Sequence, residues 1–151
     1  MKVLIAYTTR KGSTKEVAER IGEILKSKGI EVDVSDIKDK PNPADYDATI
    51  VGAPIMIGKI LHRTPRFVKK YLKVLKEKPF ACFALGGMLQ EDTSENREKM
   101  TGKLSPITDC ISPVDIGLFG GKYDEDRDYR DWDKITAWAE GLVKKFSKEN
   151  T

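Results

Sequence analysis

The sequence predicts an α/β protein in which a parallel sheet is covered by helices on both faces. Five short apolar runs alternate with segments of helical periodicity along the 151 residues. The runs are almost continuously hydrophobic, which is typical of strands that are buried on both faces. Right-handed crossovers between such strands give a three-layer, doubly wound sandwich. A chain of this length fits one domain, and we expect residues 1–151 to form a single one.

The first half of the chain contains three of the expected strands. Its elements, in order, are a strand at Val3–Tyr7, a polar loop at Thr8–Thr14, a helix from Lys15 to a stop at Gly29, a strand at Ile30–Val34 and a strand at Ala48–Val51. The break between the last two strands is the segment Pro41-Asn42-Pro43.

The second half contributes two further strands and three helices. Its elements are a helix from about Thr64 to Lys76, a strand at Phe80–Leu85, a polar helix at Ser94–Leu104, a strand at Val114–Phe119 and a last helix with an apolar stripe from Trp132 to Phe146.

Composition excludes several classes of protein. The net charge is +3, from 27 basic and 24 acidic residues, and a balance this small does not indicate nucleic-acid binding. No apolar run is long enough for a membrane span, and we see no signal peptide. Cys82 and Cys110 lie far apart without a neighbouring histidine, so we expect no metal site and no disulfide framework. We therefore expect a cytoplasmic protein.

Charge is distributed unevenly along the chain. Residues 62–78 contain seven Lys or Arg and one acid, whereas residues 124–133 contain six acids and two Arg. Two solvated faces of the protein explain this pattern. The alternative is a docking surface for a redox partner protein, and the partner of the basic segment would be acidic. The oligomeric state stays open.

The loop after the first strand contains several groups that bind phosphate. It consists of Thr8, Thr9, Arg10, Lys11, Gly12, Ser13 and Thr14, and a helix follows directly. Hydroxyl groups, a glycine that permits a tight turn, two cations and the positive end of a helix all favour a phosphate dianion. A helix cap needs only one Ser or Thr, and the spacing matches neither GxxxxGK[ST] nor GxGxxG.

This loop resembles the FMN-phosphate loop of the flavodoxins, which has the form S/T-x-T-G-x-T. Thr9, Gly12 and Thr14 align with that pattern, Ser13 stands where Asn is frequent, and Lys11 replaces a common Thr with a cation. The resemblance covers essentially the whole chain and follows the short-chain flavodoxin plan. It implies a five-stranded sheet in the order 2-1-3-4-5 and FMN as the cofactor.

A second segment resembles one subgroup of this family. Residues 46–58 and the later Phe67-Val68-Lys69-Lys70 are similar to YDxxVIGASIxxG and FVKK in flavodoxin-like, menaquinone-dependent protoporphyrinogen oxidases. Pro54 replaces the usual Ser, and the long insertion of those enzymes near the fifth strand is absent from this sequence. The likeness supports a shared flavin site better than a shared substrate.

The flavin ring is expected between the loops that follow the third and fourth strands. The residues on the two sides are Pro54, Ile55, Met56, Ile57 and Gly58, and Gly86, Gly87, Met88, Leu89 and Gln90. Neither loop contains the Trp or Tyr with which familiar flavodoxins stack on the ring. Met and aliphatic groups are one alternative, and contacts from His62, Phe119 or Tyr123 are another; Met56 and Met88 are also consistent with core packing.

The function expected from these features is FMN-dependent electron transfer to a redox partner protein. The alternative is an FMN-dependent oxidoreductase of the protoporphyrinogen oxidase or quinone reductase type. A receiver module on the same fold needs an acidic cluster after the first strand, and that place holds Thr8-Thr9. We identify no catalytic residue, because the single histidine, His62, lies beside Arg63 in a segment that reads as a solvated loop.

Overall fold

Five parallel strands form the centre of the protein in a computed structural model that describes residues 1–149. They are β1 (Lys2–Tyr7), β2 (Glu31–Asp36), β3 (Ala48–Met56), β5 (Phe80–Gly86) and β6 (Asp115–Gly120). Their order is β2-β1-β3-β5-β6, which confirms the predicted sheet. The sequence did not predict a sixth, two-residue strand, β4 (Lys59–Ile60), which pairs antiparallel with the end of β3.

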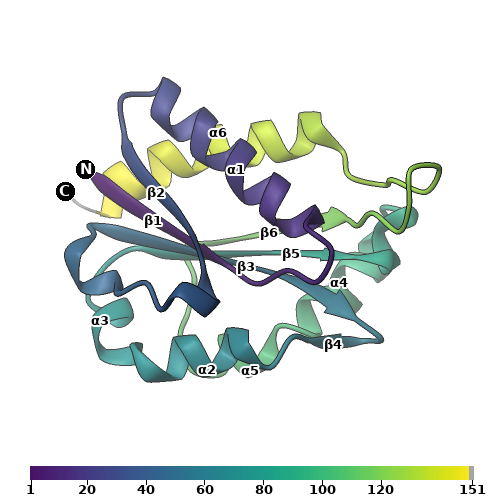
Figure 1. Ribbon diagram of the computed structural model, residues 1–151, viewed down its shortest axis with the longest axis horizontal. Coiled ribbons are helices and arrows are strands. Elements are labelled where there is room, and N and C mark those ends of the chain that lie inside the picture. The colour runs from purple at the N-terminus through teal and green to yellow at the C-terminus, as the bar shows by residue number, and fades with distance from the viewer. Residues whose placement is uncertain (150–151) are drawn as a thin grey trace.

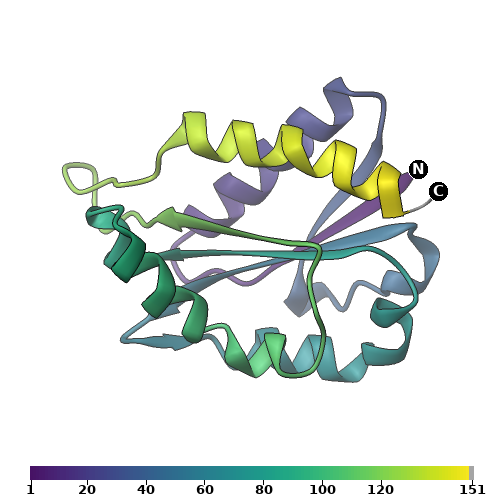
Figure 2. The ribbon, with the colours of Figure 1, turned by 180° about the vertical axis from the view of Figure 1, so that it is seen from behind.

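Helices cover both faces of the sheet, as expected for a doubly wound fold (Figures 1 and 2). On one face lie α1 (Ser13–Ser27) and α6 (Trp132–Glu149). On the other face lie α2 (Arg63–Lys70), α3 (Leu72–Lys76), α4 (Ser94–Gly102) and α5 (Ser105–Thr108). Each face has its own cluster of buried side chains, so the apolar strands are buried on both sides. No helix in residues 1–149 is both long and apolar enough to cross a membrane.

Two predicted helices are shorter in the structure than the apolar pattern suggested. The helix expected at residues 64–76 is divided at Tyr71, whose backbone leaves the helical region with φ −109° and ψ 20°. The Tyr71 ring packs against Phe67, with the ring centroids 5.2 Å apart. The helix expected to reach Leu104 ends at Gly102, and a separate turn, α5, follows it.

The strand register places the site at one edge of the sheet. Tyr7 at the end of β1 lies opposite Gly52, Pro54 lies opposite Leu85, and Gly86 lies opposite Gly120. The carboxyl ends of β1, β3, β5 and β6 therefore lie at the same edge, where doubly wound proteins bind their ligands. Figure 1 shows the β3–β4 hairpin and the loop before α6 projecting at this edge, opposite the N-terminus.

Candidate functional site

The loop between β1 and α1 presents free hydrogen-bonding groups at a helix N-terminus. Gly12 precedes α1 with φ +90°, a left-handed conformation that L side chains rarely adopt. No side chain caps this helix end; the Thr9 hydroxyl instead accepts a hydrogen bond from the Gly12 N–H at 2.9 Å. The first N–H groups of α1 therefore remain available for an anion, together with the positive end of the helix dipole.

Thr14 supplies the most specific evidence that this loop binds a ligand. Its side chain is completely buried, and its Oγ1 has no hydrogen-bond partner within residues 1–149. A buried hydroxyl without a hydrogen-bond partner costs free energy, so proteins rarely retain one unless a ligand supplies the missing hydrogen bond. A Cβ at Gly12 would meet no atom within 4 Å, so the space beside this turn is open. These groups fit a phosphate.

A hollow of about 430 Å³ adjoins the same loop. It is lined by Thr8, Thr9, Arg10, Asp36, Lys38, Leu61, His62 and Arg63. Four of these residues carry basic side chains, and the three from the β1–α1 loop contribute polar groups to its wall. His62 is exposed, as the sequence suggested, and it lies beside the phosphate-type loop.

The segment after β3 forms a tight hairpin. Ile57 and Gly58 both have positive φ, 49° and 70°, which is the pattern of a type I′ turn. An isoleucine in this conformation is a true outlier, because its branched Cβ opposes the left-handed region. Its side chain is also 97% exposed. Pro54 is buried, Ile55 is half-buried against the neighbouring core, and Met56, the last residue of β3, is half-buried. The hairpin thus holds a strained apolar residue in solvent at the sheet edge, and strain of this kind is concentrated at binding sites.

The segment after β5 is a short 3₁₀ turn, Gly87–Gln90. Gly86 and Leu89 are buried, Met88 is half-buried against the core, and Gln90 is exposed. The Leu89 side chain thus packs into the core, so only its backbone is left for a ligand. Phe119 and Tyr123 lie outside these two loops and are the aromatic residues that the sequence offers as ring contacts. Phe119 is buried against Phe83 and Trp138. Tyr123 is 46% exposed.

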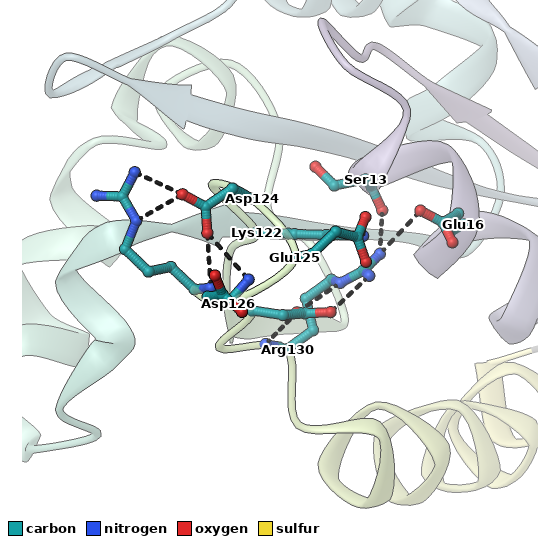
Figure 3. Close-up of polar contacts among 9 residues, drawn as sticks. Ser13, Glu16, Lys122, Asp124, Glu125, Asp126 and Arg130 are labelled. Carbon is teal, nitrogen blue, oxygen red and sulfur yellow. Dashed lines mark hydrogen bonds and ion pairs between the residues drawn. The ribbon is translucent and has the colours of Figure 1, made fainter.

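Sequence reasoning missed Arg130, whose side chain is only 3% exposed. It makes two hydrogen bonds to Asp128, at 2.9 and 2.8 Å. Its Nη1 also lies 3.3 Å from both the Ser13 carbonyl oxygen and Glu16 Oε1, as Figure 3 shows. The hydrogen bonds from Arg130 hold the pKa of Asp128 below its usual range. Arg130 therefore fastens the loop before α6 to the first turn of α1.

Three of the six acids in residues 124–133 form ion pairs with nearby cations. Asp124 pairs with Arg127, Glu125 with Lys122 and Asp128 with Arg130. Asp131 accepts the N–H groups of residues 133 and 134 at the start of α6. Beside the start of α6, hydrogen bonds from Arg97 and Lys134 lower the pKa of Asp92, which precedes α4, to about 2.

The basic segment behaves differently. We define the basic face as Lys59, Arg63, Arg66, Lys69 and Lys70. All five side chains are exposed, and none makes an ion pair within the described chain. A groove of about 650 Å³ separates part of this face from the turn at Ile37, with Phe67 and Tyr71 also in its wall. This face thus offers positive charge that no internal acid offsets.

No group of three or more His, Cys, Asp or Glu residues that would suit a metal ion occurs in residues 1–149. Cys82 is buried and Cys110 half-buried, and both are free thiols. Burial raises the pKa of the Cys82 thiol to about 12, so this side chain stays protonated and behaves as a core residue.

Comparison with known proteins adds a family and a fold. A flavodoxin domain model matches residues 4–149. Protoporphyrinogen IX dehydrogenase (quinone) of Escherichia coli K12 is 34% identical over 87 residues, covering 56% of this chain and 48% of that protein. The protein of the same name from Leishmania major is 29% identical over 129 residues, covering 80% and 54%. The chain thus spans about half the length of the curated relatives it matches.

Several solved structures of similar shape are flavodoxins. Flavodoxin 1 of Bacillus cereus has a TM-score of 0.67 at 19% identity, covering 95% of this chain and 98% of that one. An FMN-bound flavodoxin of Fusobacterium nucleatum has a TM-score of 0.61 at 13% identity, covering 96% and 98%. At these identities, the similarity shows the fold.

Proposed function

Because this chain belongs to the flavodoxin domain family, we propose that it binds FMN and transfers electrons through it. The observation that carries this proposal is the buried, unpartnered Thr14 hydroxyl beside the left-handed Gly12, at an α1 N-terminus that no side chain caps. FMN, when bound, supplies one- and two-electron redox chemistry, and the protein supplies binding, orientation and electrostatics.

The phosphate loop would hold FMN by its phosphate. The Thr14 hydroxyl and the first N–H groups of α1 donate hydrogen bonds, and Arg10 and Lys11 add exposed positive charge. The Thr9 hydroxyl stabilises the turn, because it accepts a hydrogen bond from the Gly12 N–H. Thr8 and Ser13 complete this loop.

The ring would lie between the hairpin after β3 and the turn after β5. Its contacts on the hairpin side are Pro54, Ile55, Met56, Ile57 and Gly58, and on the other side Gly86, Gly87, Met88, Leu89 and Gln90. The exposed Ile57 would be covered by the ring, which explains why an isoleucine is presented to solvent.

An acidic redox protein is the partner that the basic face favours. Its five cations have no counter-ion among residues 1–149, whereas three of the six acids of residues 124–133 form ion pairs. Charge of one sign steers a partner of the opposite sign and raises the association rate. The two free thiols support a reducing compartment, and we propose the cytoplasm.

A second candidate function is suggested by the curated relatives, which are named as protoporphyrinogen IX dehydrogenases that act with quinone. In that case a porphyrinogen would be oxidised at the same flavin. The two functions are separated by an assay of the FMN-loaded protein with protoporphyrinogen IX and a soluble quinone. Turnover of protoporphyrinogen IX supports the enzymatic function. No turnover, together with rapid electron exchange with a reductase, supports the function as an electron carrier.

Replacing Thr14 by Val tests the proposed FMN site. Val fills the same space without the unpartnered hydroxyl, so the apoprotein should unfold at the same temperature or a higher one. FMN affinity should instead fall about 10- to 100-fold, the equivalent of one charge-assisted hydrogen bond. Thr49→Val, at a buried site in the middle of the sheet, is the matched control and should leave FMN affinity unchanged. Equal FMN affinity in Thr14→Val and wild type would contradict the assignment.

A further inference from the structure

The loop of residues 121–131, between β6 and α6, reaches both ends of the proposed flavin site. Arg130 contacts the phosphate loop at one end, and Tyr123 lies against Gly87 of the ring segment at the other. We propose that this loop is a third wall of the site, in which Tyr123 contacts the flavin ring and Arg130 is a positioning residue for the phosphate loop. The proposal rests on the FMN site described above.

At the phosphate end, Arg130 acts on the peptide that joins Ser13 to Thr14. Its Nη1 donates to the Ser13 carbonyl oxygen at 3.3 Å. The peptide is planar and trans, so the Thr14 N–H on its other side points toward the open loop. A cation on the carbonyl polarises this N–H and strengthens the hydrogen bond that it donates to an anion.

Arg130 also offsets a charge that would oppose phosphate. Glu16 lies in the first turn of α1, where its negative charge would repel an anion at the helix N-terminus. Arg130 Nη1 lies 3.3 Å from Glu16 Oε1, and Figure 3 shows the Arg130 head group in contact with both the Ser13 carbonyl and the Glu16 carboxylate. Loss of Arg130 would therefore weaken the phosphate site in two ways, through the peptide and through Glu16.

At the ring end, Tyr123 is held across the backbone of Gly87. A Cβ built on Gly87 would overlap the Tyr123 hydroxyl and would lie 3.0 Å from its Cζ, so a side chain at this position would displace the Tyr123 ring from its place. Tyr123 and Ile57 are two of the three large hydrophobic side chains exposed in residues 1–149, and both belong to segments at the same edge of the sheet. A planar apolar ring between the two segments would cover both side chains.

The loop is ordered by its own hydrogen bonds. The Tyr123 N–H donates to the Arg127 carbonyl at 2.9 Å, and the Tyr129 N–H donates to the Gly121 carbonyl at 2.9 Å. The Tyr129 ring packs edge-on against Tyr123, with the centroids 6.2 Å apart. Asp128 connects this hairpin-like loop to Arg130. These contacts hold Tyr123 and Arg130 within one ordered loop.

The first test compares FMN with riboflavin, which lacks the phosphate, in an Arg130→Lys variant. Lys keeps the charge but loses the fork that spans Asp128, Ser13 and Glu16. The dissociation constant for FMN should rise about tenfold, while that for riboflavin should change less than about twofold. Arg20→Met is the matched control, because Arg20 also lies over the Trp132 ring, at 4.9 Å, and makes no contact with Ser13.

The second test removes the opposing charge. Glu16→Gln should raise FMN affinity more in an Arg130→Gln variant, which lacks the cation beside Glu16, than in the wild type, and should leave riboflavin affinity unchanged. A purely structural role for Arg130 predicts no such difference confined to FMN. Equal losses for FMN and riboflavin in Arg130→Lys, or the absence of this difference, would overturn the positioning role. If Arg130→Lys does not fold, Asp128→Asn offers the same comparison with the arginine kept.

The third test concerns Tyr123. Tyr123→Leu should weaken FMN and riboflavin by the same factor, about three- to tenfold, because both ligands contain the ring. It should also increase the fluorescence of the bound flavin, which an adjacent tyrosine quenches, whereas Tyr123→Phe should retain most of the affinity. Unchanged affinity and fluorescence in Tyr123→Leu would overturn the ring contact. If wild-type protein binds neither flavin, the proposed function itself fails; if it binds FMN and all these variants bind equally well, only the third wall is wrong.

Discussion

Thr8 and Thr64 share a buried hydrogen bond, with their Oγ1 atoms 2.9 Å apart. Thr8 directly follows β1 and opens the phosphate loop, whereas Thr64 lies in the first turn of α2. This contact therefore connects the proposed FMN site to the helix that carries most of the basic face.

Removing one member of this pair should destabilise the protein. Thr64→Val leaves the Thr8 hydroxyl buried without its partner, so we expect the free energy of unfolding to fall by about 1–3 kcal/mol. The double variant Thr8→Val, Thr64→Val leaves no unpaired hydroxyl and should recover part of this loss. Urea denaturation of the apoprotein measures both values, and additive losses would show that the two hydroxyls do not depend on each other.

Gly12 should tolerate no branched side chain. Its φ of +90° is strained for any L residue, and Gly12→Val should lower the stability of the apoprotein by about 1–3 kcal/mol. The variant should fold yet retain little FMN, because the turn and its N–H groups would shift. Gly29→Val, at φ +84° beyond the other end of α1, is a matched control for the strain alone. Visible absorbance after FMN loading measures the flavin content of the two variants. Equal flavin content in Gly12→Val and Gly29→Val would mean that the turn at Gly12 is not part of the site.

The sheet could be predicted from the sequence because its signal is local. Each central strand is an apolar run. The hydroxyl groups, the glycine and the cations that suit a phosphate follow β1 in consecutive positions of the sequence. The hairpin at β4 was missed because its strand has only two residues and its turn uses Ile57 where such turns favour Asn. The division of α2 from α3 at Tyr71 also lacks a Gly or Pro signal.

The role of Arg130 could not be predicted for a different reason. Its contacts to Ser13 and Glu16 join residues that are 117 and 114 positions apart in the chain. In the sequence it is one of two arginines within an acidic run, a pattern that indicates a solvated surface. The structure pairs three of those six acids with nearby cations, and only the folded chain brings Arg130 to the phosphate loop.

Acid should weaken the protein through Asp92. Hydrogen bonds from Arg97 and Lys134 lower the pKa of Asp92 to about 2, from an ordinary value near 3.8. The Asp92 carboxylate therefore binds a proton less readily in the folded state than in the unfolded state. Its interactions with Arg97 and Lys134 stabilise the fold above about pH 4, and this stabilisation is lost as the pH falls toward 2. Partial exposure limits the effect to about 1 kcal/mol.

An Asp92→Asn variant isolates this contribution. Its free energy of unfolding should lie below that of the wild type at pH 7, and the difference should shrink between pH 4 and pH 2. Asp45→Asn, at an exposed carboxylate with no ion pair in the described chain, is the control. A difference that stays constant across this range would mean that Asp92 stabilises the fold by something other than its charge.

The basic face should select the charge of an electron acceptor. Reduced, FMN-loaded protein should transfer electrons to the anion ferricyanide at a rate that falls with added salt, because screening removes the attraction. Transfer to the cation hexaammineruthenium(III) should become faster with salt. Arg63→Glu with Arg66→Glu should weaken or reverse both salt dependences.

The same charge change on the other side of the sheet provides the control. Lys26→Glu with Lys144→Glu lies on α1 and α6, at exposed positions without ion pairs among residues 1–149. It should leave the preference for the anionic acceptor largely intact. Stopped-flow rates at low and high salt give the comparison, and identical behaviour of the two double variants would show that net charge, rather than the basic face, governs the reaction.

The central claim is that this chain holds FMN by its phosphate, and a calorimetric titration of the apoprotein with FMN and with riboflavin tests it most directly. Several charge-assisted hydrogen bonds depend on the phosphate, each equivalent to about 1.5–3 kcal/mol, so FMN should bind at least about a hundredfold more tightly than riboflavin. Equal affinity for the two flavins, or binding of neither, would contradict the account.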